Sequence, residues 1–146
     1  MRIISLLLLF LATCAHAQTN AKLTTKLEQQ AVAIEKKVIE WRRHFHQYPE
    51  LSNREVKTGI YIAEHLKKLG LEVQHPIAKT GVVALLRTGK PGPVIALRAD
   101  IDALPVTERN SLPFASQEKT VFNGQETGIM HACGHDVHTA SLLGTA

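Results

Sequence analysis

The chain has 146 residues, 45% of them hydrophobic and 21% charged, a balance that indicates one folded globular domain and excludes a disordered chain. Its formal net charge is +4, yet lysine and arginine are spread along the chain without a dense basic run. A solvated basic surface is therefore favoured over a nucleic-acid binding face.

The first residues have the pattern of an export signal. Arg2 precedes an apolar run, residues 3–12, that is too short to cross a bilayer as a helix. Residues 15–17, Ala-His-Ala, fit the small-x-small cleavage pattern. We therefore predict a signal peptide over residues 1–17 and a domain over residues 18–146, in a secreted or periplasmic protein without a membrane span. A buried amino-terminal helix is the less favoured alternative.

The two cysteines have different expected fates. Cys14 would leave with the signal peptide; lipid attachment at Cys14 is a competing route to export, which the preceding threonine disfavours. Cys133 would then have no partner for an intrachain disulfide. An unpaired cysteine in an exported protein requires a reason such as metal ligation or a reactive thiol.

Two helices are expected first along the chain. Residues 19–48 predict an amphipathic helix that ends at Pro49, because apolar residues recur at steps of three or four. A second helix is expected to start at Ser52, with Glu55 three residues later as in a capping box. Gly70 lies where a left-handed residue usually ends a helix.

The periodicity then changes to that of strands. Residues 71–75, 81–87 and 94–98 predict three strands, and the last of these is apolar enough to be covered on both faces. A polar loop is expected to run through Gly128, and a final helix is expected with Asp136 as its cap. This order predicts an α/β domain with a mixed sheet. It also predicts an incomplete domain, since nothing follows the last helix to pack on it.

Residues 131–138 hold three histidines, a cysteine and an aspartate. Thiolate and imidazole suit zinc and similar ions, and the single glycine between Cys133 and His135 lets the backbone turn tightly. We predict that Cys133 and His135 are metal ligands, and that Asp136 and His138 lie in the surrounding shell. A cysteine nucleophile is the alternative, but it needs a base brought in from elsewhere in the fold. A zinc finger is disfavoured because a second cysteine pair is absent.

A pair of carboxylates follows the third predicted strand. Asp100 and Asp102 alternate, so they share one face of an extended segment at the kind of position where α/β sheets place active sites. An acidic turn paired with Arg98 is the plainer interpretation, and spacing alone leaves both open.

With these motifs in view, the chain resembles the M20 metallopeptidase family, and more narrowly its amidohydrolase branch of hippurate hydrolases, N-acyl-L-amino acid amidohydrolases and plant auxin-conjugate hydrolases. The resemblance begins near Ile39 and rests on five motifs in order: Arg42-Arg43-His44-Phe45-His46 with Tyr48-Pro49-Glu50, Glu55 with Thr58, residues 79–83, residues 97–105, and residues 130–139.

The resemblance implies the α/β/α sandwich of a catalytic domain, here incomplete and without the family's lid domain. It also implies two divalent metal ions (zinc, manganese or cobalt), with Cys133 and His135 among their ligands. Arg98 stands where related peptidases have a histidine ligand, so Asp100 is expected only to shape the site.

The implied reaction is hydrolysis of the amide bond of N-acyl amino acids, small molecules of the hippurate or N-acetyl type, by a metal-activated water. The general-base glutamate is expected beyond Ala146, so no catalytic residue is expected within the chain and the 146 residues alone are expected to be inactive. The family's dimer contacts come from the lid, which implies a possible homodimer. An exported, non-catalytic metal-binding module is the alternative function.

Overall fold

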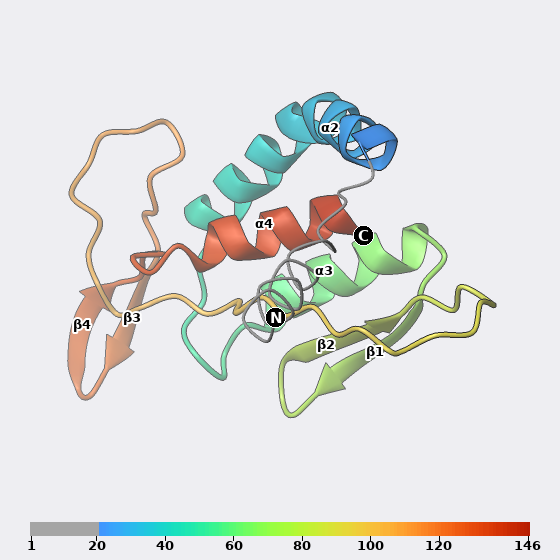
Figure 1. The fold of residues 1–146 in the computed structure, drawn as a ribbon. Helices are drawn as coiled ribbons and strands as arrows, with labels where there is room; N and C mark the ends of the chain where they lie inside the picture. Colours follow the sequence, from blue (N-terminus) through green and yellow to red (C-terminus); the bar gives the residue numbers. More distant parts are fainter. Residues whose placement is uncertain (1–20) are drawn as a thin grey trace, which may run out of the picture. The chain divides into compact units, whose positions relative to one another are not determined.

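The computed structural model describes residues 21–146, so the predicted signal peptide and its cleavage point lie outside the described residues. Figure 1 shows the helices and strands in chain order. They are α2 (Ala21–Gln47), α3 (Val56–Lys68), β1 (Glu72–Ile77), β2 (Gly81–Leu85), β3 (Lys119–Phe122), β4 (Gln125–Gly128) and α4 (His135–Thr145). Among the described residues, no helix combines the length and apolar character needed to cross a membrane.

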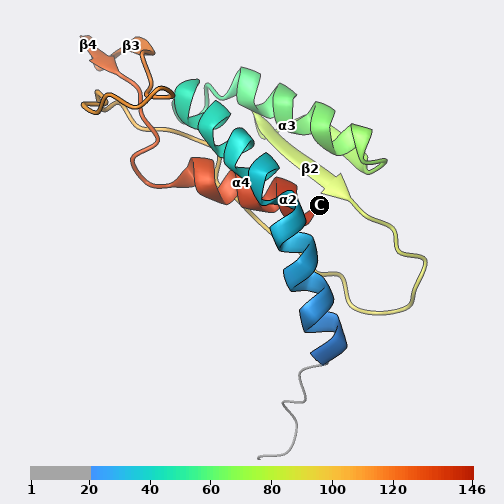
Figure 2. The same cartoon turned by 90° about the horizontal axis from the view of Figure 1, so that it is seen from above.

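Ile34–Ala146 form the second of two compact units into which the chain divides. The second unit has its hydrophobic core where α2, α3 and α4 meet (Figure 2). Trp41 and Phe45 lie four residues apart on α2 and are 5% and 2% exposed. They pack with Ile62 of α3 and with Ala140 and Leu143 of α4. This core therefore anchors α4, the helix that follows the predicted metal motif.

The long first helix is confirmed over Ala21–Gln47, and its end lies within one residue of the prediction, inside the usual uncertainty of helix boundaries. Its first two predicted residues, 19 and 20, lie outside the described residues. The predicted start of the second helix at Ser52 is wrong, since α3 begins at Val56. Glu55 accepts hydrogen bonds from the Asn53 N–H (3.0 Å) and the Thr80 hydroxyl (2.7 Å), so it does not form a capping box with Ser52. Gly70 is left-handed (φ 82°), as predicted.

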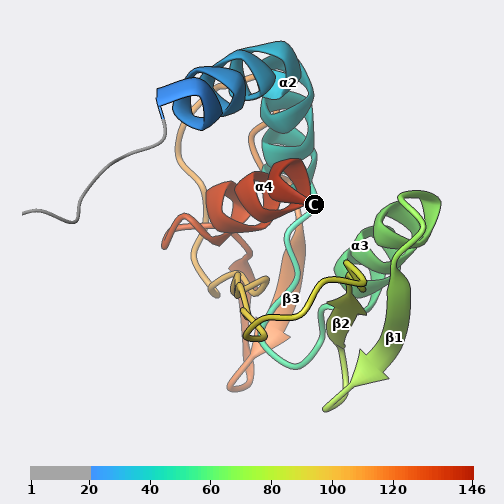
Figure 3. The same ribbon diagram turned by 45° about the vertical axis from the view of Figure 1, so that its right-hand side comes forward.

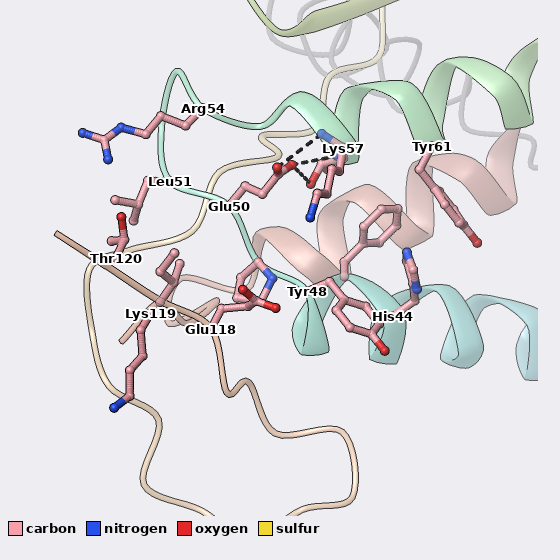
Figure 4. A pocket seen from close by; sticks show the side chains of 14 residues that line it. His44, Tyr48, Glu50, Leu51, Arg54, Lys57, Tyr61, Glu118, Lys119 and Thr120 are labelled. Carbon is pink, nitrogen blue, oxygen red and sulfur yellow. Dashed lines mark hydrogen bonds between the residues drawn. The ribbon is translucent and has the colours of Figure 1, made fainter. Parts of the chain in front are cut away.

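Glu50 is the carboxylate that satisfies the first turn of α3. Its Oε2 accepts hydrogen bonds from the Thr58 N–H (2.8 Å) and the Thr58 hydroxyl (2.9 Å), and its Oε1 accepts one from the Lys57 N–H (3.3 Å), as Figure 4 shows. A negative charge at this end of a helix is stabilising because the first N–H groups have no partner within the helix. The capping carboxylate is thus that of Glu50, which lies five residues before Glu55 and therefore outside the spacing of a capping box.

The strands form two separate two-stranded antiparallel sheets, so the predicted mixed sheet does not form in the described residues. β1 pairs with β2, with Glu72 opposite Leu85, and this hairpin contacts α3 (Figure 3). The described elements are still those of an incomplete α/β domain. What is missing is the pairing that would join the strands into one sheet.

The third predicted strand, residues 94–98, is irregular in the structure, which corrects the prediction. Val94 is 89% exposed and Ile95 is 80% exposed. An extended segment becomes a strand only when a neighbour accepts and donates its backbone hydrogen bonds. Residues 21–146 place no such neighbour beside this segment, so its apolar composition alone does not make it a strand.

The predicted loop before Gly128 instead contains a β-hairpin, which is a second correction. β3 and β4 pair with Phe122 opposite Gln125, and Asn123 (φ 51°) and Gly124 (φ 79°) form the turn. Asn-Gly with both φ values positive is the preferred sequence of a two-residue hairpin turn. The signal was present in the sequence, but the short strands around it lack strong apolar alternation.

Candidate metal centre

The segment Cys133-Gly134-His135, here called the candidate corner, connects an isolated β-bridge to α4. Met130 and Leu104 exchange backbone hydrogen bonds of 3.0 Å, which brings the segment after residue 98 beside the segment before α4. Gly134 has φ 81°, a left-handed conformation that favours glycine, and it stands at the N-cap of α4. The prediction that Asp136 caps this helix is therefore wrong, because α4 already begins at His135.

The ring of His135 is oriented by Asp102. His135 Nδ1 lies 2.9 Å from the Asp102 carbonyl oxygen and 3.0 Å from its Oδ1. Both partners are acceptors, so Nδ1 must carry a proton and donate it. When the ring is neutral, Nε2 then has the free lone pair, and the side chain is 20% exposed. A ring held by a carboxylate at one nitrogen and free at the other is the usual form of a metal-binding histidine.

Asp100 lies on the open side of the same ring. Its Oδ2 is 4.0 Å from His135 Nε2, and its backbone carbonyl accepts a hydrogen bond from the Thr139 hydroxyl (3.0 Å). Arg98 also pairs with Asp100, with Nη2 at 2.6 Å from Oδ1, so the predicted acidic turn is present as well. Hydrogen bonding and charge attraction from Arg98 lower the pKa of the Asp100 carboxyl, which keeps it ionised beside the imidazole.

Cys133 in the candidate corner and His138 in the first turn of α4 both have exposed side chains. The rings of His138 and His135 stack with their centroids 5.7 Å apart. His131, in contrast, is buried, and its Nδ1 has no hydrogen-bond partner among the described residues. Burial lowers the pKa of His131 to about 4, so this ring is neutral near pH 7.

Asp136 points away from the candidate corner and toward α2. Its side chain is 1% exposed; Oδ2 lies 2.9 Å from Arg42 Nε and 2.8 Å from His46 Nδ1. The imidazole that Asp136 holds is thus that of His46, whereas Asp102 holds that of His135. The place of Asp136 and His138 around a bound metal stays a prediction.

His46 contacts a second buried carboxylate at its other nitrogen. Its Nε2 lies 2.8 Å from Glu108 Oε1, and both side chains are at most 5% exposed. Although burial by itself raises the pKa of the Glu108 carboxyl, hydrogen bonds from His46, the Ser116 N–H and Asn110 outweigh it and lower the pKa. Sequence patterns missed His46 and Glu108 because 62 residues separate them. Asp102 carried a signal, its alternation with Asp100.

The described residues supply some, but not all, of the ligands that a metal site requires. Within residues 21–146, no three side chains of histidine, cysteine, aspartate or glutamate lie close enough to share one metal ion. The thiol of Cys133 and Nε2 of His135 are suitable donors on one tight turn, whereas zinc sites usually take three or four protein ligands. Further ligands would have to come from outside the described residues.

A separate concavity of about 510 Å³ lies on another part of the second unit (Figure 4). Glu50, Arg54, Lys57, Tyr61 and Lys119 are among the residues that line it. None of the predicted metal-site residues contributes to its lining. The candidate metal centre is therefore distinct from this concavity.

Comparison with known proteins finds a family match that includes the candidate corner. Residues 96–146 match the model of peptidase family M20/M25/M40. The chain is 50% identical over 130 residues to an N-acetyl-L-cysteine deacetylase of Bacillus subtilis, covering 87% of this chain and 29% of that protein. It is 52% identical over 110 residues to an N-acyl-L-amino acid amidohydrolase of Geobacillus stearothermophilus, covering 75% of this chain and 27% of that protein.

Two solved structures share the fold. One is described as an aminohydrolase from methicillin-resistant Staphylococcus aureus, with a TM-score of 0.72 and 46% identity over 82% of this chain and 30% of that one. The other is a Bacillus subtilis protein described as a dinuclear metal-binding peptidase of the M20 family, with a TM-score of 0.68 and 47% identity over 77% of this chain and 30% of that one. The chain thus spans less than a third of the length of these relatives. By sequence and fold it is a member of the M20 peptidase family and corresponds to the amino-terminal part of the family's amidohydrolases.

Proposed function

We propose that this chain supplies part of the metal centre of a hydrolase that cleaves the amide bond of N-acyl amino acids, with Cys133 and His135 as metal ligands. The observation that carries the proposal is the orientation of His135, whose Nδ1 is held by Asp102 while Nε2 is free. Support for the substrate class comes from relatives named as an N-acetyl-L-cysteine deacetylase and an N-acyl-L-amino acid amidohydrolase.

In this proposal two divalent ions, zinc, manganese or cobalt, would lower the pKa of a water and polarise the acyl carbonyl of the substrate. The residues of the chain have distinct tasks around them. Cys133 provides a thiolate, and His135 provides Nε2 in the tautomer that Asp102 enforces. Asp100 places a carboxylate beside the same nitrogen and shapes the site without a defined step of its own.

The chain of 146 residues is proposed to be inactive by itself. The candidate corner offers two ligands, and residues 21–146 contain no three-donor cluster. Amide hydrolysis also requires a general base within reach of the water, and no described carboxylate beside Cys133 or His135 is free for this role, since Asp100 pairs with Arg98 and Asp102 with His135. We propose that the base is a glutamate outside these residues.

Export and assembly remain proposals drawn from the sequence. The apolar run before Ala17 supports a secreted or periplasmic location, with cleavage after Ala17 and lipid attachment at Cys14 as the less favoured route. The proposed partner is a small N-acyl amino acid, without nucleic acid or a membrane span. A homodimer would form through a lid domain that these residues do not include.

Two experiments test the function. In a chimera, this chain replaces the matching 130 residues of the Bacillus subtilis N-acetyl-L-cysteine deacetylase. The chimera is expected to release acetate from N-acetyl-L-cysteine, to lose activity on chelation, and to recover it with Mn²⁺, Zn²⁺ or Co²⁺. A folded chimera that binds metal but hydrolyses nothing would favour the metal-binding module instead.

The second experiment examines the ligands in the chain itself. Cobalt is titrated into the Cys14→Ser chain, in which Cys133 is the one remaining thiol, and a thiolate-to-cobalt absorption band is expected. The band should disappear in Cys133→Ser and weaken in His135→Gln, while His44→Gln serves as the matched histidine control. A band of unchanged strength in His135→Gln would contradict the assignment of that ligand.

A further inference from the structure

Four charged or ionisable side chains, three of them buried and one partly exposed, form a connected group behind the candidate corner, here called the charge network: Arg42, His46, Glu108 and Asp136. Asp136 Oδ2 contacts both Arg42 Nε (2.9 Å) and His46 Nδ1 (2.8 Å), and His46 Nε2 contacts Glu108 Oε1 (2.8 Å). The side chains of Asp136 and Glu108 are each 1% exposed, that of His46 is 5% exposed and that of Arg42 is 32% exposed.

A carboxylate lies beside each ring nitrogen of His46. Asp136 Oδ2 and Glu108 Oε1 are acceptors and each lies 2.8 Å from a ring nitrogen, so the arrangement suits a ring that donates from both nitrogens. The Arg42 Nη2 donor lies farther from Nδ1, at 3.4 Å. Charge balance leads to the same result, since Arg42 and a charged His46 together neutralise Asp136 and Glu108. A neutral His46 would leave one of the two carboxylate charges without a compensating cation.

The charge network joins three segments that are far apart in sequence. Arg42 and His46 belong to α2, Glu108 belongs to the segment before β3, and Asp136 lies in the first turn of α4. Phe114 covers the group, with its ring centroid 5.3 Å from the Arg42 guanidinium and 5.9 Å from the His46 ring. The apolar cover limits water, which strengthens the attraction between the charges.

The first turn of α4 is consequently held from two sides. Asp102 holds the ring of His135, and His46 holds the next residue, Asp136. Gly134 precedes both in a left-handed turn, and nothing lies within 4 Å of the position that its Cβ would take. Packing around this glycine therefore does not fix the direction of the candidate corner, which depends on the side chains that anchor α4.

We propose that His46 is a positioning residue for the candidate metal centre: by bridging Asp136 and Glu108 as an imidazolium, it sets where Cys133 and His135 present their donor atoms. The inference rests on the proposed function, because it assumes that these two residues bind metal. His46 itself does not contact the metal or the substrate in this proposal.

Cobalt binding to the full chain tests the inference, in the Cys14→Ser background and with the intensity of the thiolate band as readout. His46→Gln is expected to weaken cobalt affinity about 10- to 100-fold, the usual effect of removing a group that orients a ligand from outside the coordination shell. The control is His44→Gln, on the same helix, whose ring stacks on Tyr61. Its affinity for cobalt is expected to be unchanged.

A rescue variant separates positioning from general stability. In His46→Gln with Glu108→Gln, two amides replace the imidazolium and the carboxylate, so the buried group is neutral again and can form the same bridge. Cobalt affinity is expected to return to within about threefold of the parent chain, because a second-site change restores the anchoring of Asp136. If the single variant fails to fold, the test depends on the double variant. Cobalt affinity within about threefold of the parent chain then supports the inference, and a lower affinity in a folded double variant contradicts it.

The outcomes distinguish the two proposals. The chimera with the deacetylase supplies the ligands that residues 21–146 lack, so the same variants are compared in the chimera if the chain alone gives no band. A chimera without any cobalt–thiolate band that depends on Cys133 overturns the proposed ligands, and the inference about His46 with them. A parent chain with the band, and a folded His46→Gln chain with unchanged affinity, overturns the inference alone. Nitrogen NMR of the parent chain gives an independent check, since a His46 ring with one unprotonated nitrogen near pH 7 would contradict the bridge.

Discussion

Two histidines close to the same turn of α4 have opposite environments. His135 is held by Asp102 at Nδ1, has Nε2 free and is 20% exposed. His46 is held by carboxylates at both nitrogens and is 5% exposed. A carboxylate on one nitrogen prepares a ligand, whereas a carboxylate on each nitrogen makes the ring a buried cation that joins segments. The number of acceptors around a ring, rather than the residue type, separates the two roles.

The largest expected effect comes from removing the carboxylate that the buried cations share. Asp136→Ala leaves Arg42 and His46 without their common partner, so we expect a loss of about 3–5 kcal/mol in the free energy of unfolding. Urea denaturation followed by circular dichroism measures this loss. Glu40→Ala is the control, because it breaks the exposed Lys37–Glu40 pair and should change stability by less than about 1 kcal/mol. A loss as small as that of the control would mean that Asp136 does not stabilise a buried network.

The next prediction compares the two histidines directly. His46→Gln should lower the free energy of unfolding by about 3 kcal/mol, because Glu108 keeps a buried charge without its cation. His135→Gln should lower it by about 1 kcal/mol, the net value of one partly exposed hydrogen bond. Urea denaturation of both variants in parallel provides the measurement. Equal losses would remove the distinction between a structural and a ligating histidine.

A substitution at Asp102 tests whether the carboxylate beside His135 prepares that histidine to bind metal. Asp102→Asn replaces the carboxylate by an amide and weakens the hold on His135 Nδ1, although the backbone carbonyl of the same residue remains a partner. We expect about 10-fold weaker cobalt binding with a change in stability below about 1 kcal/mol. Asp100→Asn is the matched control for loss of a nearby charge. Weaker binding in the control than in Asp102→Asn would assign the main role to Asp100.

The smallest effect concerns a third histidine, His44, for which residues 21–146 place no carboxylate beside the ring. Burial lowers the pKa of His44 below its usual 6.5, so the folded chain resists protonation that the unfolded chain accepts. The unfolded state therefore binds more protons between the two pKa values, and stability falls as the pH drops from 7 through this window. His44→Gln should make the fall shallower in urea titrations between pH 7 and pH 5, whereas the exposed His138→Gln should leave it as steep as in the parent chain.

Local patterns predicted the helices better than the sheets. The apolar repeat that includes Trp41 and Phe45 predicts α2, and these side chains are indeed in the core. The segment that begins at Val94 has an equally clear apolar pattern but is irregular and exposed. A helix satisfies its backbone hydrogen bonds within itself, whereas a strand depends on a neighbour that the pattern does not name. The same dependence explains why the mixed sheet was predicted wrongly.

The candidate site divides in the same way. The spacing of Cys133, Gly134 and His135 is a local property, and the left-handed turn at Gly134 follows from glycine's freedom at positive φ. The amino-acid order by itself thus determined a tight turn that carries a thiol and an imidazole. It also determined the motifs by which the chain is recognised as an M20-family sequence.

Only the tertiary structure decided which carboxylate faces which imidazole. Asp102 and His135 are 33 residues apart, His46 and Glu108 are 62 apart, and His46 and Asp136 are 90 apart. Short-range patterns do not reach across such separations, because the chain between the partners brings them together only through the packing of α2 and α4 around the core. Ring protonation depends on these long-range contacts, since a nitrogen beside an acceptor must carry a proton and a nitrogen without one is free to bind a metal.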